Sequence, residues 1–135
     1  MLSDLFAEQR LYINAFFDQL DLSECERVLE KLLVCEGSLV LTGVGKSGRI
    51  AEKIAATLVS TGTYARYLSP MDALHGDIGC LSNRDLLILF SKSGESKELL
   101  DLVPYAQKKG VSTIGIVSVS HSRLARQTDL SVVLP

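Results

Sequence analysis

The chain has 135 residues, of which 47% are hydrophobic and 22% are charged, and its formal net charge is −2. These values are typical of a folded globular protein rather than a disordered one. Because there is no run of basic residues, the sequence argues against a nucleic acid or an anionic membrane surface as the main partner. No apolar run approaches the roughly 20 residues that a membrane span requires. We therefore expect neither a nucleic-acid partner nor a membrane partner.

The cysteines indicate the cellular compartment. Cys25, Cys35 and Cys80 lie far apart, and no C-x-x-C pair is present to hold a metal ion. An odd number of cysteines without a signal peptide is typical of reduced thiols. We expect a cytoplasmic protein that uses no metal and no other cofactor.

The first 36 residues predict two helices, because apolar residues recur at helical spacing in two separate stripes. Between the stripes, Asp21-Leu-Ser-Glu24 has the spacing of a capping box, and Gly37 is a plausible stop for the second helix. Such helices could cover the core or could form part of a dimer interface. We expect an even-numbered assembly, a homodimer or a homotetramer.

From Gly37 onward, segments of strand and helix character alternate. The predicted strands cover residues 38–42, 64–68, 86–90, 112–117 and 130–134. Helices are predicted from about Arg49 to Ser60 and after Ser96, where Pro104 should kink or split the helix. Residues 70–81 read as irregular or briefly helical.

This alternation predicts an α/β fold. We expect a doubly wound, five-stranded parallel sheet with right-handed crossovers and the flavodoxin-like order 2-1-3-4-5, preceded by the two N-terminal helices. Residues 1–135 are expected to form a single domain, with a helical lead-in over 1–36 and the sheet over 37–135. Since both faces of such a sheet need cover and no helix follows the last strand, we expect a chain truncated at its C-terminus.

A hydroxyl-rich loop follows the third predicted strand. Ser91-Lys-Ser-Gly-Glu-Ser96 leads directly into a helix, and the free N–H groups of a first helical turn form a ready anion site. Ser91, Ser93 and Ser96 would add donors, Lys92 adds a positive charge, and Gly94 lets the backbone approach a ligand closely. Glu95 would be repelled by a phosphate, so its presence hints at a chemical role. The alternative is a turn whose serines only cap the helix.

A second glycine-rich loop, Gly43-Val-Gly-Lys-Ser-Gly48, follows the first predicted strand. It is not a Walker A loop, because the position that requires the first glycine is Val40. It matches the dinucleotide fingerprint G-x-G-x-x-G, but the second strand ends without the acidic residue that binds a ribose. A dinucleotide-binding domain therefore stays an alternative function, weaker than the two given below.

The predicted strand order brings the two loops together. Strands one and three are neighbours in the order 2-1-3-4-5, and ligands bind in the crevice between their carboxyl ends. We expect one loop to hold a phosphate while Gly45, Lys46 and Ser47 of the other loop face the rest of a small molecule.

Taken in order along the chain, these motifs resemble those of the sugar isomerase (SIS) domain, and more narrowly the arabinose-5-phosphate isomerases that supply Kdo for bacterial lipopolysaccharide. The likeness rests on the two loops together with Ala55-Ala-Thr57, Ser60-Thr-Gly-Thr63 and His75-Gly-Asp77. The sequence differs at Lys92, where the family commonly has asparagine. The family's later catalytic glutamate and histidine, and its paired CBS domains, would lie beyond residue 135.

The resemblance implies roles for individual residues. It assigns phosphate binding to Ser91, Ser93 and Ser96 and active-site positions to Lys46 and Glu95. It places His75 near the active site, where it could serve a neighbouring subunit.

The implied reaction interconverts D-ribulose 5-phosphate and D-arabinose 5-phosphate through an enediol. An ammonium such as that of Lys46 would stabilise the enediolate oxygen, and Glu95 would act as the base or would orient Lys46 and the substrate hydroxyls. The alternative function is a non-catalytic regulatory domain that binds a phosphosugar.

Overall fold

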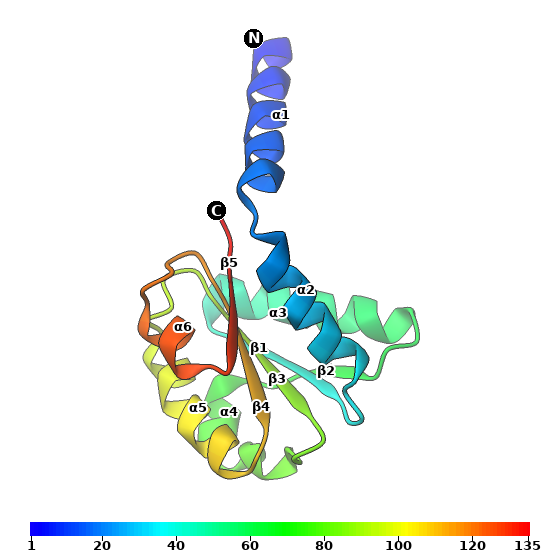
Figure 1. Ribbon diagram of the computed structural model, residues 1–135, viewed down its shortest axis with the longest axis vertical. Coiled ribbons are helices and arrows are strands. Elements are labelled where there is room, and N and C mark those ends of the chain that lie inside the picture. Colours follow the sequence, from blue (N-terminus) through cyan, green and yellow to red (C-terminus); the bar gives the residue numbers. More distant parts are fainter.

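The computed structural model describes residues 1–135 and contains a five-stranded, all-parallel sheet in the order β2-β1-β3-β4-β5 (Figure 1). The strands are β1 (Leu39–Gly43), β2 (Ala65–Tyr67), β3 (Leu86–Ser91), β4 (Ser112–Val117) and β5 (Leu130–Val133). The predicted strand order is confirmed, and each strand begins and ends within one residue of its predicted bounds. The sheet is predictable because its buried strands are almost continuously apolar.

Helices cover both faces of the sheet, which separates the core into two layers. The helices are α1 (Leu2–Gln19), α2 (Leu22–Leu33), α3 (Gly45–Ser60), α4 (Pro70–Leu74), α5 (Lys97–Lys108) and α6 (Arg123–Gln127), with a 3-10 turn η1 over Asp77–Cys80. One apolar cluster joins the sheet to α2 and α3, and the other joins it to α4, α5 and α6. Because side chains alternate along a strand, Leu41 belongs to the first cluster and its neighbour Val40 to the second.

Helix α1 extends away from the rest of the molecule (Figure 1). None of its residues is buried, although it carries several large apolar side chains. Helix α2 does contact the body, and its Glu24 carboxylate accepts a hydrogen bond from the Val133 N–H of the edge strand β5 at 3.2 Å. The predicted cap at Asp21 is present, since its side chain accepts hydrogen bonds from Ser23 N and Glu24 N. No helix of the structure combines the length and the apolarity needed to cross a bilayer.

Four local predictions were wrong. Helix α3 begins at Gly45 rather than near Arg49, so most of the predicted glycine loop is its first turn. Helix α5 is not split at Pro104, because fully buried side chains before the proline (Leu99, Leu102 and Val103) and after it (Ala106) hold the helix against the sheet.

The other two concern a helix and a helix end. The short helix α6 was not predicted, since five residues are too few for a periodic pattern. Gly37 does not stop α2, which already ends at Leu33. A side chain at Gly37 would instead collide with the backbone carbonyl of Arg84, 2.5 Å from the added Cβ.

A nearly buried carboxylate fastens the start of the sheet. Asp85 Oδ1 accepts a hydrogen bond from Ser38 N at 2.7 Å, and Oδ2 accepts one from Ser82 N at 2.8 Å. Burial raises the pKa of Asp85, but these hydrogen bonds and the nearby Arg66 guanidinium outweigh it and leave the pKa below its ordinary value of 3.8. The ionised carboxylate therefore favours the folded chain.

We predict that Asp85→Asn lowers the free energy of unfolding at pH 7 by about 1–3 kcal/mol, because an amide cannot accept both backbone hydrogen bonds. Since the folded pKa lies below the unfolded value of 3.8, the contribution of Asp85 is complete above that pH and is lost as the pH falls through the folded value. Urea unfolding measured from pH 7 to pH 2 should show a smaller loss of stability with acid in the variant. Equal losses in both proteins would contradict this account.

Candidate functional site

The carboxyl ends of the two central strands form the expected ligand-binding edge. Strands β1 and β3 are neighbours, and Gly43 at the end of β1 is paired with Phe90 near the end of β3. Their following helices, α3 and α5, pack on opposite faces of the sheet and begin at this edge. The crevice between two such strands is the usual binding site in an open α/β sheet.

A hollow of about 540 Å³ lies at this edge. Seven residues from three segments line it, namely Ser47, Ser91, Lys92, Ser93, Ser96, Ser118 and Val119. A smaller hollow of about 170 Å³ shares Ser47, Ser91, Lys92 and Ser118 and adds apolar side chains, among them Phe90 and Ile116. The structure therefore brings Ser47 of the first loop together with four predicted residues of the second.

The serines of the second loop differ in their surroundings. Ser91 is buried, its Oγ accepts a hydrogen bond from Gly94 N at 3.1 Å, and it lies 3.0 Å from Ser96 Oγ. Ser93 is exposed, and its Oγ accepts a hydrogen bond from Glu95 N at 3.2 Å. Ser91 thus braces the loop, whereas the Ser93 hydroxyl proton is free to point toward a ligand.

Gly94 allows the loop to lie directly against α6. Its φ of +66° is the left-handed conformation that favours glycine, and a Cβ added here would collide with Ser122 Oγ. The Gly94 carbonyl also accepts a hydrogen bond from Leu124 N at 3.0 Å. Gly94 itself is buried rather than part of the lining, so its role is to hold the loop in place.

The glycines of the first loop allow a helix to approach a strand closely. A Cβ added at Gly48 would lie 2.5 Å from the Gly43 carbonyl oxygen, so a larger residue would push α3 away from β1. Tyr67 of β2 donates a hydrogen bond from its hydroxyl to the same oxygen at 3.1 Å. Burial is the main cause that raises the pKa of Tyr67, which keeps this donor protonated. Gly45, the first residue of α3, is exposed and lies outside the lining.

The three residues expected to be catalytic lie outside the lining of the hollow. Lys46 is exposed in the first turn of α3, next to Ser47, and its ammonium has no ion-pair partner. His75 is exposed at the C-terminal cap of α4. Glu95 follows Ser93 and Gly94 but is directed to α6 by the contacts described next.

Arg123 holds the Glu95 carboxylate at both oxygens. Arg123 N donates to Oε1 at 2.8 Å, and Arg123 Nε donates to Oε2 at 2.5 Å. The backbone hydrogen bond from Arg123 is the largest cause of a Glu95 pKa below its ordinary value, followed by the bond from the guanidinium. Glu95 is therefore ionised at neutral pH.

Sequence reasoning missed Ser118, Val119 and Arg123. Ser118 and Val119 directly follow β4, and Ser118 N donates to the Lys92 carbonyl at 2.9 Å. The position of Ser118 directly after the predicted strand 112–117 could have indicated that it lies at the site, because the carboxyl ends of all parallel strands lie at one edge of the sheet. No sequence signal could pair Arg123 with Glu95 across 28 residues.

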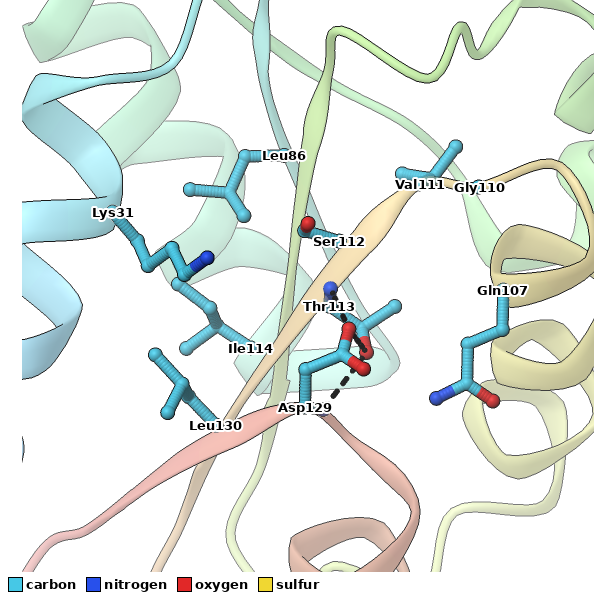
Figure 2. Close-up of a pocket in the computed structure, with 10 residues that line it drawn as sticks. All are labelled: Lys31, Leu86, Gln107, Gly110, Val111, Ser112, Thr113, Ile114, Asp129 and Leu130. Carbon is cyan, nitrogen blue, oxygen red and sulfur yellow. Dashed lines mark hydrogen bonds between the residues drawn. The ribbon is translucent and has the colours of Figure 1, made fainter.

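A hollow of about 420 Å³ lies at the opposite edge, where β3, β4 and β5 begin (Figure 2). The Asp129 carboxylate faces it and accepts hydrogen bonds from Thr113 N at 2.7 Å and Thr113 Oγ1 at 2.8 Å (Figure 2). The hollow is lined by one carboxylate, Asp129, and one ammonium, Lys31, and no helix of eight or more residues begins at it. The two hollows therefore differ in the ligands that they suit.

The electrostatics of the hollow at the carboxyl edge suit a small anion. Neither α3 nor α5 has a side-chain cap, so N–H groups of both first turns stay available. Ser47 in the first turn of α3 and Ser96 at the N-terminal cap of α5 both line this hollow, so the positive ends of both helix dipoles lie next to it. With hydroxyls from Ser47, Ser93 and Ser118 around it and Lys92 at its rim, this site can bind a phosphate group.

Comparison with known proteins identifies relatives of the chain. KpsF of Escherichia coli O6:H1 (strain CFT073), an arabinose 5-phosphate isomerase, is 43% identical over 123 residues, which are 91% of this chain and 38% of KpsF. An uncharacterized protein of Chlamydia pneumoniae is 42% identical over 132 residues, 98% of this chain and 40% of that protein. The chain thus spans about two fifths of the length of the curated relatives it matches.

Solved structures share the fold. A crystal structure from Listeria monocytogenes aligns with a TM-score of 0.91 and 30% identity, covering 99% of this chain and 70% of that one. An Escherichia coli CFT073 protein in complex with arabinose 5-phosphate aligns with a TM-score of 0.83 and 37% identity, covering 98% of this chain and 74% of that one.

The family model described as the SIS domain matches residues 32–135, which begin in α2 and include the whole sheet. This range contains both loops that meet at the hollow. The chain therefore belongs to the SIS domain family.

Proposed function

We propose that the chain is the substrate-binding and catalytic domain of an aldose–ketose isomerase that interconverts D-ribulose 5-phosphate and D-arabinose 5-phosphate. The observation that carries the proposal is the hollow at the carboxyl edge, where hydroxyls meet two uncapped helix N-termini. The similarity to KpsF and to a protein bound to arabinose 5-phosphate supports the choice of sugar phosphate. The product would enter Kdo and lipopolysaccharide synthesis.

The proposed phosphate site uses residues from both loops. Ser93 and Ser96 would donate hydroxyl hydrogen bonds, and Ser91 would keep the loop in shape. Ser47 and the first-turn N–H groups of α3 and α5 would complete the set of donors. The Lys92 ammonium would add positive charge at the rim, without the paired hydrogen bonds that a planar arginine guanidinium could make to a phosphate.

The proposed chemistry begins with removal of a proton from the carbon next to the substrate carbonyl. The electron pair of that C–H bond forms the enediolate, whose negative oxygen needs a fixed positive partner. Lys46 suits this role, because it directly precedes Ser47 in the chain and its ammonium has no competing ion pair. A proton then moves from the hydroxyl oxygen on one of the two carbons to the oxyanion on the other, and the carbon-bound proton returns to the adjacent carbon, which completes the isomerisation.

His75 is proposed to act in a neighbouring subunit's site, since it is exposed and lies outside the hollow of its own chain. This role requires an oligomer. The three free thiols support the proposal of a cytoplasmic protein, because such thiols persist in a reducing compartment.

Helix α1 is the proposed interface with a second copy of the chain. Helices in proteins owe most of their stability to the packing of an apolar face, yet none of the 18 residues of α1 is buried within its own chain. Leu2, Leu5, Phe6 and Ile13 form an apolar surface along one side of it. A symmetric pairing of two such surfaces would cover both and give a homodimer or a homotetramer.

For the phosphate site, we predict that Ser93→Ala weakens binding of arabinose 5-phosphate about ten- to hundredfold, since a hydrogen bond to a charged group contributes about 1.5–3 kcal/mol. Isothermal titration calorimetry gives the dissociation constants. Ser120→Ala is the matched control, because Ser120 is an exposed serine outside the lining of the hollow. Equal affinities of the two variants would remove Ser93 from the site.

For the reaction, a coupled assay with ribulose 5-phosphate should be run on this chain and on one extended past Pro135. We expect turnover in the extended chain and its loss, by about 10²-fold or more, in Lys46→Met. Full activity of Lys46→Met would exclude Lys46 from the mechanism. Sugar-phosphate binding without turnover in the extended chain would contradict the isomerase and favour the regulatory function.

For the assembly, we predict that Phe6→Glu together with Ile13→Glu lowers the molar mass measured by light scattering after size-exclusion chromatography to that of a monomer. A charge buried in an apolar interface has no partner to offset its desolvation. Glu8→Lys, on the opposite side of α1, is the control and should leave the oligomer intact. Oligomers that survive the double substitution would show that α1 is not the interface.

A further inference from the structure

The contact between Glu95 and Arg123 links the second loop to α6 more firmly than an ordinary surface ion pair. Glu95 accepts one hydrogen bond from a backbone N–H and one from a guanidinium, so both of its oxygens are fixed. A typical exposed ion pair contributes little, because two long side chains must be ordered to form it. Here one of the two donors is the rigid backbone of a helix terminus.

The surrounding backbone fixes the two partners relative to each other. Leu124 N donates to the Gly94 carbonyl at 3.0 Å, one residue from Glu95. Ser122 lies so close to Gly94 that no side chain fits between them. The Glu95–Arg123 contact therefore belongs to a larger set of contacts that packs the second loop against the start of α6.

The contact also decides what the carboxylate can do. The charged groups that act on Glu95 are Arg123, which donates both hydrogen bonds, and Arg126 of the same helix. Both favour the ionised form, and a group with a lowered pKa is a weak proton acceptor near neutral pH. A carboxylate has about four lone-pair positions, of which Arg123 occupies two. The remaining positions can accept hydrogen bonds from ligand hydroxyls.

We propose that Arg123 is a positioning residue, which holds Glu95 as a fixed hydrogen-bond acceptor for the sugar hydroxyls and thereby prevents it from serving as the catalytic base. This inference rests on the proposed function, since it assigns the sugar end of a sugar phosphate to Glu95. It leaves phosphate binding to the serines and the helix N-termini. The base is then a different group.

Two substitutions remove first one and then both of the Arg123 hydrogen-bond donors. Arg123→Met removes the guanidinium and keeps the backbone N–H. Arg123→Pro removes both donors, and proline is well tolerated here because position 123 is the first residue of α6. The preceding Ser122 already has the extended conformation, with φ −65° and ψ 159°, that a residue before proline requires.

The first measurement is the Glu95 pKa, followed by carboxyl carbon NMR in the 135-residue chain. We expect the pKa to rise in Arg123→Met and to rise further in Arg123→Pro. Arg126→Met removes the same charge from α6 without removing a contact to Glu95 and should give a smaller rise than either. An unchanged pKa in Arg123→Pro, or an equal rise in Arg126→Met, would overturn the proposal.

The second measurement compares the affinities for arabinose 5-phosphate and inorganic phosphate in the same proteins. We expect Arg123→Pro to weaken sugar-phosphate binding about tenfold while its affinity for inorganic phosphate stays unchanged. A preserved preference for the sugar phosphate would overturn the role of Arg123. If the unsubstituted chain binds both ligands equally, the proposed function fails instead, whereas the pKa series still decides whether Arg123 positions Glu95.

Discussion

The site depends on one constraint, the meeting of two uncapped helix N-termini at the carboxyl ends of neighbouring parallel strands. Because β1 and β3 are adjacent, α3 and α5 leave the same edge on opposite faces of the sheet. Their first turns bring unpaired N–H groups and two positive dipole ends to one hollow. The serines supply directional donors, but the fold itself makes the place favourable for an anion.

Close backbone contacts keep this arrangement in register. Gly43 and Gly48 let α3 lie directly against β1, and Gly94 lets the second loop lie directly against α6. Each contact excludes even a methyl group, so the glycines act through packing more than through contact with a ligand. The Glu95–Arg123 contact adds two hydrogen bonds to the second of these contacts, between the loop and α6.

The sequence was sufficient to predict the sheet and the meeting of the loops, because both follow from apolar periodicity and from the topology of parallel strands. It was insufficient where tertiary contacts decide. The glycines led us to predict that α3 begins near Arg49. In the structure α3 begins at Gly45, and the missing side chain at Gly48 lets its first turn pack closely against β1. The partner of Glu95 lies on a helix too short to predict, so no local pattern could reveal how the carboxylate is held.

Two features of the chain are the grounds for the proposed oligomer. Helix α1 is fully formed and yet has no buried residue within its own chain, which is why we propose that its apolar side chains pack against a second copy. His75 likewise lies outside the hollow of its own chain. Both features are explained if the functional unit contains more than one copy of the domain.

The most direct test of the central claim is a crystal structure of the chain bound to arabinose 5-phosphate. The account predicts a phosphate group between the first turns of α3 and α5, within hydrogen-bond distance of the Ser93 hydroxyl and of backbone N–H groups from both helices. A phosphate bound elsewhere, for example at the edge where β4 and β5 begin, would contradict it.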